Sequence, residues 1–130
     1  MKKESFLVWA ISLLQDILST PEKQAWCLRY SPFSDNSDQE PLHRDLREFM
    51  KRAYESNLII SNYKDILDAS NFQERAMIQA DENWVKTLSN EQLLACISWH
   101  FRRDHFNEGS LISESIATGA LLRFMLYLVP

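Results

Sequence analysis

The stretch Leu-His-Arg-Asp-Leu-Arg-Glu-Phe-Met-Lys-Arg-Ala-Tyr, residues 42–54, decides the fold class of this 130-residue chain. Its apolar residues recur at intervals of three and four, so they share one face of a helix, and charged residues occupy the opposite face. The apolar face holds Leu42, Leu46, Phe49, Met50, Ala53 and Tyr54, and the charged face holds Arg44, Arg47, Glu48, Lys51 and Arg52. The pattern predicts an amphipathic helix that ends near Asn57.

Helical spacing and helix-start signals recur on both sides of this stretch. Thr20-Pro21-Glu22 has a hydroxyl at the cap position, a proline at the first helical position and an acid in the first turn. Ser89 and Gln92 fit a capping box. Together these signals predict helices over residues 5–19, 21–30, 42–57, 62–68, 89–101, 110–119 and 120–128, and one or two short helices within residues 72–88.

Turn-forming residues are scarce, because the chain contains two glycines and four prolines. A sandwich or a barrel needs many tight turns, so these classes are excluded. Leu58-Ile59-Ile60 is apolar but has no evident partner strand, and we interpret it as a buried extended linker. Residues 31–41 are predicted to form an exposed loop. We expect an all-α fold in which residues 1–130 form a single domain, an irregular bundle of about six to seven helices.

The helical faces also predict the core. The residues expected at its centre are Trp9, Leu13, Ile17, Phe49, Ala53, Ile97, Leu121, Phe124 and Leu128.

Charge and cysteine content narrow the functional class. The formal net charge is −4, which argues against nucleic acid as the main partner. Cys27 and Cys96 are far apart and lack metal-site spacing, so they are expected to be reduced thiols in a cytoplasmic protein. The apolar runs near both ends are too short for a membrane span, and the first does not fit a secretory signal. The common nucleophile, phosphate-loop and zinc-protease motifs are absent, so we name no catalytic residue, cofactor or metal and lean against an enzyme.

Side chains that could bind or catalyse are concentrated in one segment, residues 99–109, which we call the box. Its sequence is Trp-His-Phe-Arg-Arg-Asp-His-Phe-Asn-Glu-Gly. His100 and His105 are five residues apart and diverge on a helix, which disfavours a shared metal. Two interpretations stay open. In the first, the arginines brace a helix end, and Phe106, Gly109 and the later Gly119 have structural roles. In the second, Arg102, Arg103, His105 and Glu108 bind an anion or a partner.

The segment 102–109, followed by Gly119 and the apolar residues 121–128, resembles the C-terminal signature of a family of small uncharacterised bacterial proteins. That family has an Arg-x-x-Arg-Phe-x-x-Gly box. Arg102, Phe106 and Gly109 stand at matching box positions, and Glu108 stands at the position before the glycine. His105 stands where the family usually has arginine. Residues 45–50 and 54–58 resemble its middle section, so the similarity spans about residues 42–128. The resemblance implies a helical fold and a bacterial or phage source, and it supplies no activity.

The acidic residues suggest a partner. Residues 31–40 and 65–82 are rich in acids, and the expected partner surface comprises Asp35, Asp38, Glu40, Asp81 and Glu82. Acidic surfaces attract basic proteins and speed their association. The first hypothesis is therefore a non-enzymatic immunity or inhibitor protein that covers the active site of a basic toxin or effector. The alternative is a helical ligand-sensing, nucleotide-binding or anion-binding domain that uses the Arg102–Gly109 box.

Overall fold

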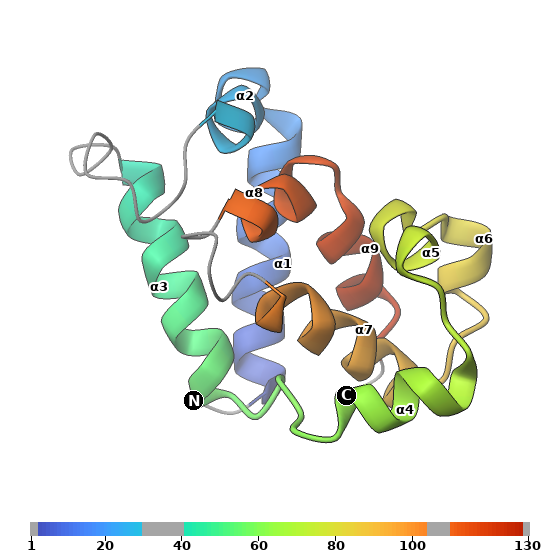
Figure 1. The fold of residues 1–130 in the computed structure, drawn as a ribbon. Coiled ribbons are helices and arrows are strands. Elements are labelled where there is room, and N and C mark those ends of the chain that lie inside the picture. Colours follow the sequence, from blue (N-terminus) through green and yellow to red (C-terminus); the bar gives the residue numbers. More distant parts are fainter. Residues whose placement is uncertain (1–2, 30–40, 104–109, 129–130) are drawn as a thin grey trace.

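Helices make up most of the part of the chain that the structure describes. A computed structural model describes residues 3–29, 41–103 and 110–128, and these ranges contain helices but no strand (Figure 1). The helices are α1 (Lys3–Ser19), α2 (Pro21–Arg29), α3 (Pro41–Glu55), α4 (Tyr63–Ser70), α5 (Glu74–Gln79), α6 (Glu82–Val85), α7 (Asn90–Arg102), α8 (Ser110–Ala117) and α9 (Ala120–Leu126). None of the helices in these ranges is long and apolar enough to cross a membrane.

The all-α prediction is confirmed, but the expected number of helices was too low. The described ranges contain nine helices, and the two within residues 72–88 agree with the one or two short helices expected there. Ala80 separates them with a left-handed backbone, φ +46°, which ends α5. The predicted loop over residues 31–41 lies outside the described residues except for Pro41, which is instead the first residue of α3. Proline suits that position because its missing N–H would have no partner there.

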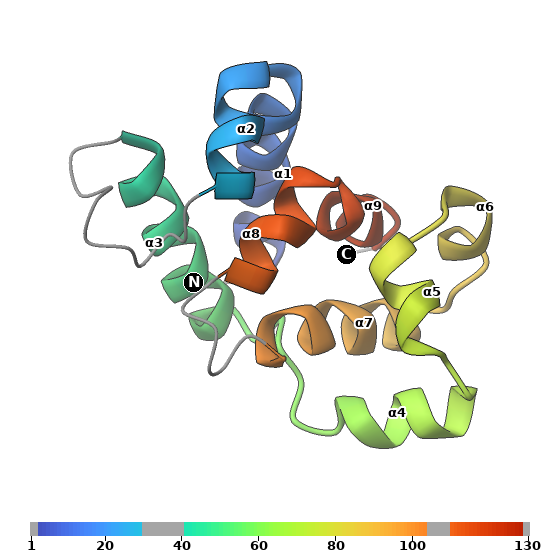
Figure 2. The same ribbon diagram turned by 45° about the horizontal axis from the view of Figure 1, so that its top comes forward.

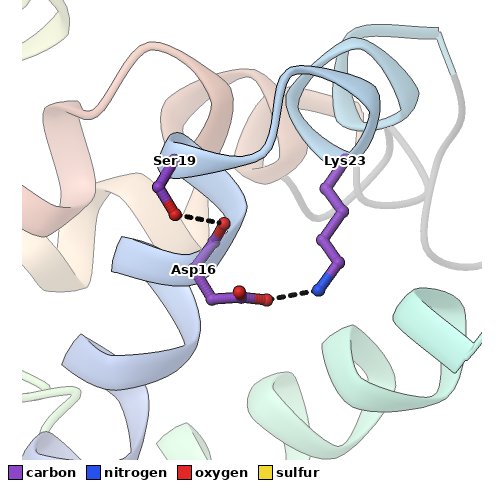
Figure 3. Close-up of polar contacts among 3 residues, drawn as sticks. All are labelled: Asp16, Ser19 and Lys23. Atoms are coloured by element: carbon purple, nitrogen blue, oxygen red, sulfur yellow. Dashed lines mark hydrogen bonds and ion pairs between the residues drawn. The ribbon is translucent and has the colours of Figure 1, made fainter.

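Local polar contacts are present at the corner between α1 and α2 (Figure 3). The Ser19 hydroxyl donates to the Asp16 carbonyl at 3.0 Å, and the Asp16 carboxylate forms an exposed ion pair with Lys23. Exposed ion pairs contribute only about 0–1 kcal/mol. The corner therefore depends more on the apolar face of α1, where Phe6, Ala10 and Ile17 are fully buried.

The later helices pack around α9. This helix contacts α1, α7, α8, α5 and α6. Elsewhere α4 lies along α7, and α2 lies against α8, as Figure 2 shows. The side-chain amide of Gln24 reinforces the second pairing by donating to the Ala117 carbonyl at the end of α8, at 2.7 Å. The predicted linker at Leu58–Ile60 is non-helical, and its Ile60 N–H donates to Ser98 of α7.

Aromatic side chains divide the core into two groups that meet on α7. The first joins α1, α3 and α7, with Phe49 lying 5.7 Å from Phe6 and 5.5 Å from Phe101 between ring centroids. The second joins α9 to α7 and to the segment after α4, through contacts among Phe72, Trp84, Phe124, His100 and Trp99. Tilted and edge-to-face pairs of this kind add to the stabilisation from burial.

The predicted core is confirmed at six of its nine positions. The fully buried ones are Ile17, Phe49, Ala53, Ile97, Leu121 and Phe124. The other three, Trp9, Leu13 and Leu128, are only partly buried and pack against the rim of the core. At the rim, the Trp9 ring contacts the Arg52 guanidinium, whose carbon lies 4.6 Å from the ring centroid.

Arg123 joins two helix ends to α9. It donates to the carbonyls of Ala80 and Gln79 at the end of α5, at 2.7 and 3.1 Å, and to the Thr118 carbonyl after α8, at 3.3 Å. The last carbonyls of a helix lack intrahelical partners, so a cation there is stabilising. Gly119 lies at the same corner with φ +83°.

Shortening single side chains of α9 tests this packing. Leu121 is fully buried and Leu126 on the same helix is 48% exposed. We expect Leu121→Ala to lower the free energy of unfolding by about 2–5 kcal/mol, because a buried leucine leaves a cavity. The matched variant Leu126→Ala should cost less than about 1 kcal/mol. Urea denaturation measures both, and equal effects would contradict the burial pattern.

Gly119 supplies a second stability prediction. A Cβ there would lie 2.9 Å from Nη1 of Arg123, and positive φ is unfavourable for alanine. Gly119→Ala should therefore lower the free energy of unfolding by more than about 1 kcal/mol. Thermal unfolding followed by circular dichroism measures this loss, and an unchanged Tm would show that the turn does not need glycine.

Candidate functional site

The structure describes some of the predicted site residues and not others. His105, Phe106, Glu108 and Gly109 lie outside the described residues, as do Asp35, Asp38 and Glu40. Arg102 and Arg103 are at the C-terminal end of α7, with Arg102 exposed and Arg103 half-buried. Asp81 and Glu82 are exposed at the start of α6. The two arginines line one pocket, and Asp81 and Glu82 are not among its lining residues.

A pocket of about 490 Å³ lies beside Arg102 and Arg103. Helices α4, α5 and α7 and the turn between α4 and α5 form its walls, and α4 is seen beside α7 in Figure 2. This volume is within the range of small-molecule sites, about 300–1,000 Å³. The lining residues are Tyr63, Lys64, Leu67, Asp68, Phe72, Glu74, Met77, Trp99, Arg102 and Arg103.

Charged side chains of both signs line the pocket, and four of them form no ion pair with one another: Lys64, Asp68, Glu74 and Arg102. Among the described residues, neither Lys64 nor Arg102 forms an ion pair with a carboxylate, and Asp68 and Glu74 form none with a cation. All four are exposed. With Arg103, the lining has three cationic side chains, which donate hydrogen bonds, and two carboxylates, which accept them.

Aromatic side chains supply the apolar part of the pocket. Trp99, Tyr63 and Phe72 are each partly buried and line it. The Arg103 guanidinium carbon lies 4.6 Å from the Trp99 ring centroid, which is a cation–π contact. An arginine stacked in this way presents its planar set of N–H donors in a defined plane.

A buried chain of hydrogen bonds lies behind the part of the pocket wall that Met77 and Arg103 form. His100 is fully buried, its Nδ1 is 2.8 Å from Oγ of Ser115, and its Nε2 is 2.9 Å from the Met77 carbonyl oxygen. Nη2 of Arg103 lies 3.1 Å from the same Ser115 oxygen. Met77 and Arg103 line the pocket, so the chain joins two of its walls through the interior of the protein.

The capacity of each group to donate or accept shows where the protons lie in this series of hydrogen bonds. The pKa of His100 is lowered to about 3, chiefly by burial and also by the Arg103 charge, while the hydrogen bond to the Met77 carbonyl acts in the opposite direction. The ring is therefore neutral at pH 7 and carries one proton. The Met77 carbonyl can only accept, so Nε2 carries that proton and Nδ1 accepts from the Ser115 hydroxyl. Ser115 then accepts from Arg103.

This arrangement does not provide nucleophilic chemistry. A histidine with a pKa of about 3 is a weak base at neutral pH, and neither Ser115 nor His100 lines the pocket. Cys96 is one helical turn before His100, but burial raises the pKa of its thiol to about 12, and both His100 nitrogens bond elsewhere. Burial also raises the pKa of Cys27, to about 11. The geometry is that of a pocket with one wall joined to the interior by hydrogen bonds.

The fold and the pocket thus define an all-helical protein with a charged, aromatic-lined pocket of ligand size. Residues 37–128 match the model of a family of unknown function, DUF6508, and the chain belongs to this family. No curated protein and no solved structure matches the chain. The match confirms the expected membership of a family of unknown function, over residues 37–128 where about 42–128 were expected. The Arg-x-x-Arg-Phe-x-x-Gly box ascribed to the family, and its role in this chain, stay predictions. All the pocket-lining residues and Ser115 lie within the matched range.

Sequence reasoning missed several residues of this site. Lys64, Tyr63 and Met77 are distant in sequence from the arginine box, and nothing in their local pattern marked them. His100 did carry a signal, because it continues the apolar face of Leu93 and Ile97 at helical spacing. A histidine on such a face is expected to be buried and hydrogen-bonded.

The buried His100 predicts a pH dependence of stability. Its pKa is lowered to about 3 in the folded protein, against an ordinary value of 6.5, so the unfolded chain binds the extra proton between these pH values. The stability associated with a neutral His100 is therefore fully present above pH 6.5 and is lost as the pH falls toward 3. Between pH 7 and 5.5 the wild-type protein should lose about 1 kcal/mol more than His100→Gln, which does not titrate.

Urea unfolding of both proteins at the two pH values measures this difference. Glutamine can still donate to the Met77 carbonyl, and the carboxylates are common to both proteins. Equal losses in the two proteins would mean that His100 does not resist protonation.

Proposed function

We propose that this protein is a non-enzymatic binding module whose pocket between α4, α5 and α7 takes a small anion that carries an aromatic ring. The observation that carries the proposal is the meeting of Lys64, Arg102 and Arg103 with Trp99 and other aromatic side chains in one pocket. Phosphate and carboxylate groups suit the arginines, and rings stack on tryptophan and on guanidinium planes. A nucleoside monophosphate has both features.

The two carboxylates refine this ligand class. Asp68 and Glu74 line the same pocket and form no ion pair with its cations. Carboxylates accept hydrogen bonds, so they suit an amino group on the ring, such as that of adenine or cytosine. We therefore chose adenosine 5′-monophosphate as the first probe, with phenyl phosphate as a ring-bearing anion that has no amino group.

The immunity or inhibitor hypothesis remains a second proposal, for a cytoplasmic bacterial protein. The observation in its favour is that the acidic residues of segment 65–82, Asp65, Asp68, Glu74, Asp81 and Glu82, are all exposed. An inhibitor would use this surface against a basic protein, and Asp81→Lys with Glu82→Lys should then abolish the complex. These two residues are outside the pocket lining, so the substitutions should leave anion binding intact.

Thermal unfolding with and without ligand tests the pocket proposal. A ligand that binds the folded state at 100 times its Kd adds about 2.7 kcal/mol, so adenosine monophosphate should raise Tm by several degrees. Arg102→Gln should reduce this shift strongly. The matched control Arg75→Gln removes the same charge from an exposed arginine of α5 that does not line the pocket, and it should keep most of the shift.

Inorganic phosphate and ribose 5-phosphate, which lack the ring, should give smaller shifts. If neither adenosine monophosphate nor phenyl phosphate raises Tm at millimolar concentration, or if both arginine variants behave alike, the pocket proposal fails.

A further inference from the structure

Arg103 differs from the other two pocket cations in how it is held. Lys64 and Arg102 are exposed, whereas Arg103 is half-buried, stacks on Trp99 and donates to Ser115 of α8. A long flexible side chain loses rotamer freedom when it binds a ligand, and this loss weakens binding. Arg103 is already ordered in the protein, so its guanidinium meets an anion at a smaller entropic cost.

The hydrogen-bond chain gives Ser115 a defined orientation. A serine hydroxyl has one proton, and the Leu111 carbonyl, at 3.1 Å, competes for it with Nδ1 of His100, at 2.8 Å. Because the His100 tautomer is set by the Met77 carbonyl, Nδ1 is an acceptor and takes the proton. The Ser115 oxygen is then left to accept from the Arg103 guanidinium.

We propose that Ser115, oriented by His100, is a positioning residue for ligand binding, because it holds the Arg103 guanidinium at the pocket wall in the plane that receives the anion. This inference rests on the proposed function, since it takes Arg103 to be an anion-binding group. The new element is that Ser115, a buried residue of α8 outside the pocket lining, affects how tightly the pocket binds its ligand.

The chain offers a matched control on the same helix. Ser113 is two residues from Ser115 and is equally buried, at 1% against 3% exposed. Its hydroxyl has no hydrogen-bond partner among the described residues. Ser113→Ala and Ser115→Ala thus remove the same atom from equally buried positions of one helix. Only Ser115→Ala removes hydrogen bonds, those with Arg103, His100 and the Leu111 carbonyl, so the double variant described below is needed to isolate the effect through Arg103.

The test is the Kd of adenosine monophosphate, measured by calorimetry on folded protein at pH 7. Ser115→Ala should weaken binding about tenfold, equivalent to about 1.4 kcal/mol, and Ser113→Ala should leave Kd unchanged within about twofold. Arg103→Gln should also weaken binding. The decisive measurement is the double variant, because a residue that acts through Arg103 loses its effect when Arg103 is absent.

In the Arg103→Gln background, Ser115→Ala should therefore change Kd by less than about twofold. A full tenfold effect in that background would show a general loosening of the pocket and would overturn the proposal. An unchanged Kd for Ser115→Ala alone would also overturn it. If Ser115→Ala does not fold, Ser115→Cys replaces it, because a thiol has the same shape but is a weak acceptor.

The outcomes separate the proposed pocket function from the proposed role of Ser115. If the wild-type protein binds none of the anions, both of these fail together. If the wild-type protein binds and Arg102→Gln weakens binding while Ser115→Ala does not, the pocket function stands and the positioning role of Ser115 is wrong.

Discussion

Much of this structure depends on keeping His100 neutral inside the protein. A buried imidazole is tolerated only when both nitrogens have partners, and here the partners come from two other segments, Met77 of α5 and Ser115 of α8. Satisfying the ring thus fixes α5 and α8 against α7. The same two segments form or brace the wall of the pocket, so the constraint that stabilises the interior also shapes the candidate site.

Helix α7 is where this constraint connects with the rest of the fold. It begins at the Ser89–Gln92 capping box, and its Phe101 and His100 belong to the two aromatic groups of the core. It ends with Arg102 and Arg103, which line the pocket. One helix therefore anchors the core at its centre and presents cations at its end. The rigidity that packing gives to the helix is passed to the side chains that would meet a ligand.

Much of the fold could be predicted, because its signals are local. The capping box forms as expected, with Ser89 Oγ accepting from the Gln92 N–H at 3.2 Å and the Gln92 side chain accepting from the Ser89 N–H. The breaks between helices were harder to place, because only two glycines mark them. The described chain also turns at Asn57, Asn71 and Ala80 with positive φ. Asparagine favours this conformation and could have been used as a signal, but alanine does not, and the surrounding packing imposes it at Ala80.

The sequence by itself determined the helical class, most helix positions and most of the centre of the core, and it singled out the arginines at the end of α7 as candidates for a site. These properties depend on the spacing of apolar residues and on caps, which act within a few residues of the chain. Only the tertiary structure decided that Lys64, Trp99 and Arg103 share a pocket, that Ser115 contacts Arg103, and that Arg123 closes the ends of α5 and α8. Such contacts join residues up to 44 positions apart. They arise from how the helix faces pack together, which no local pattern encodes.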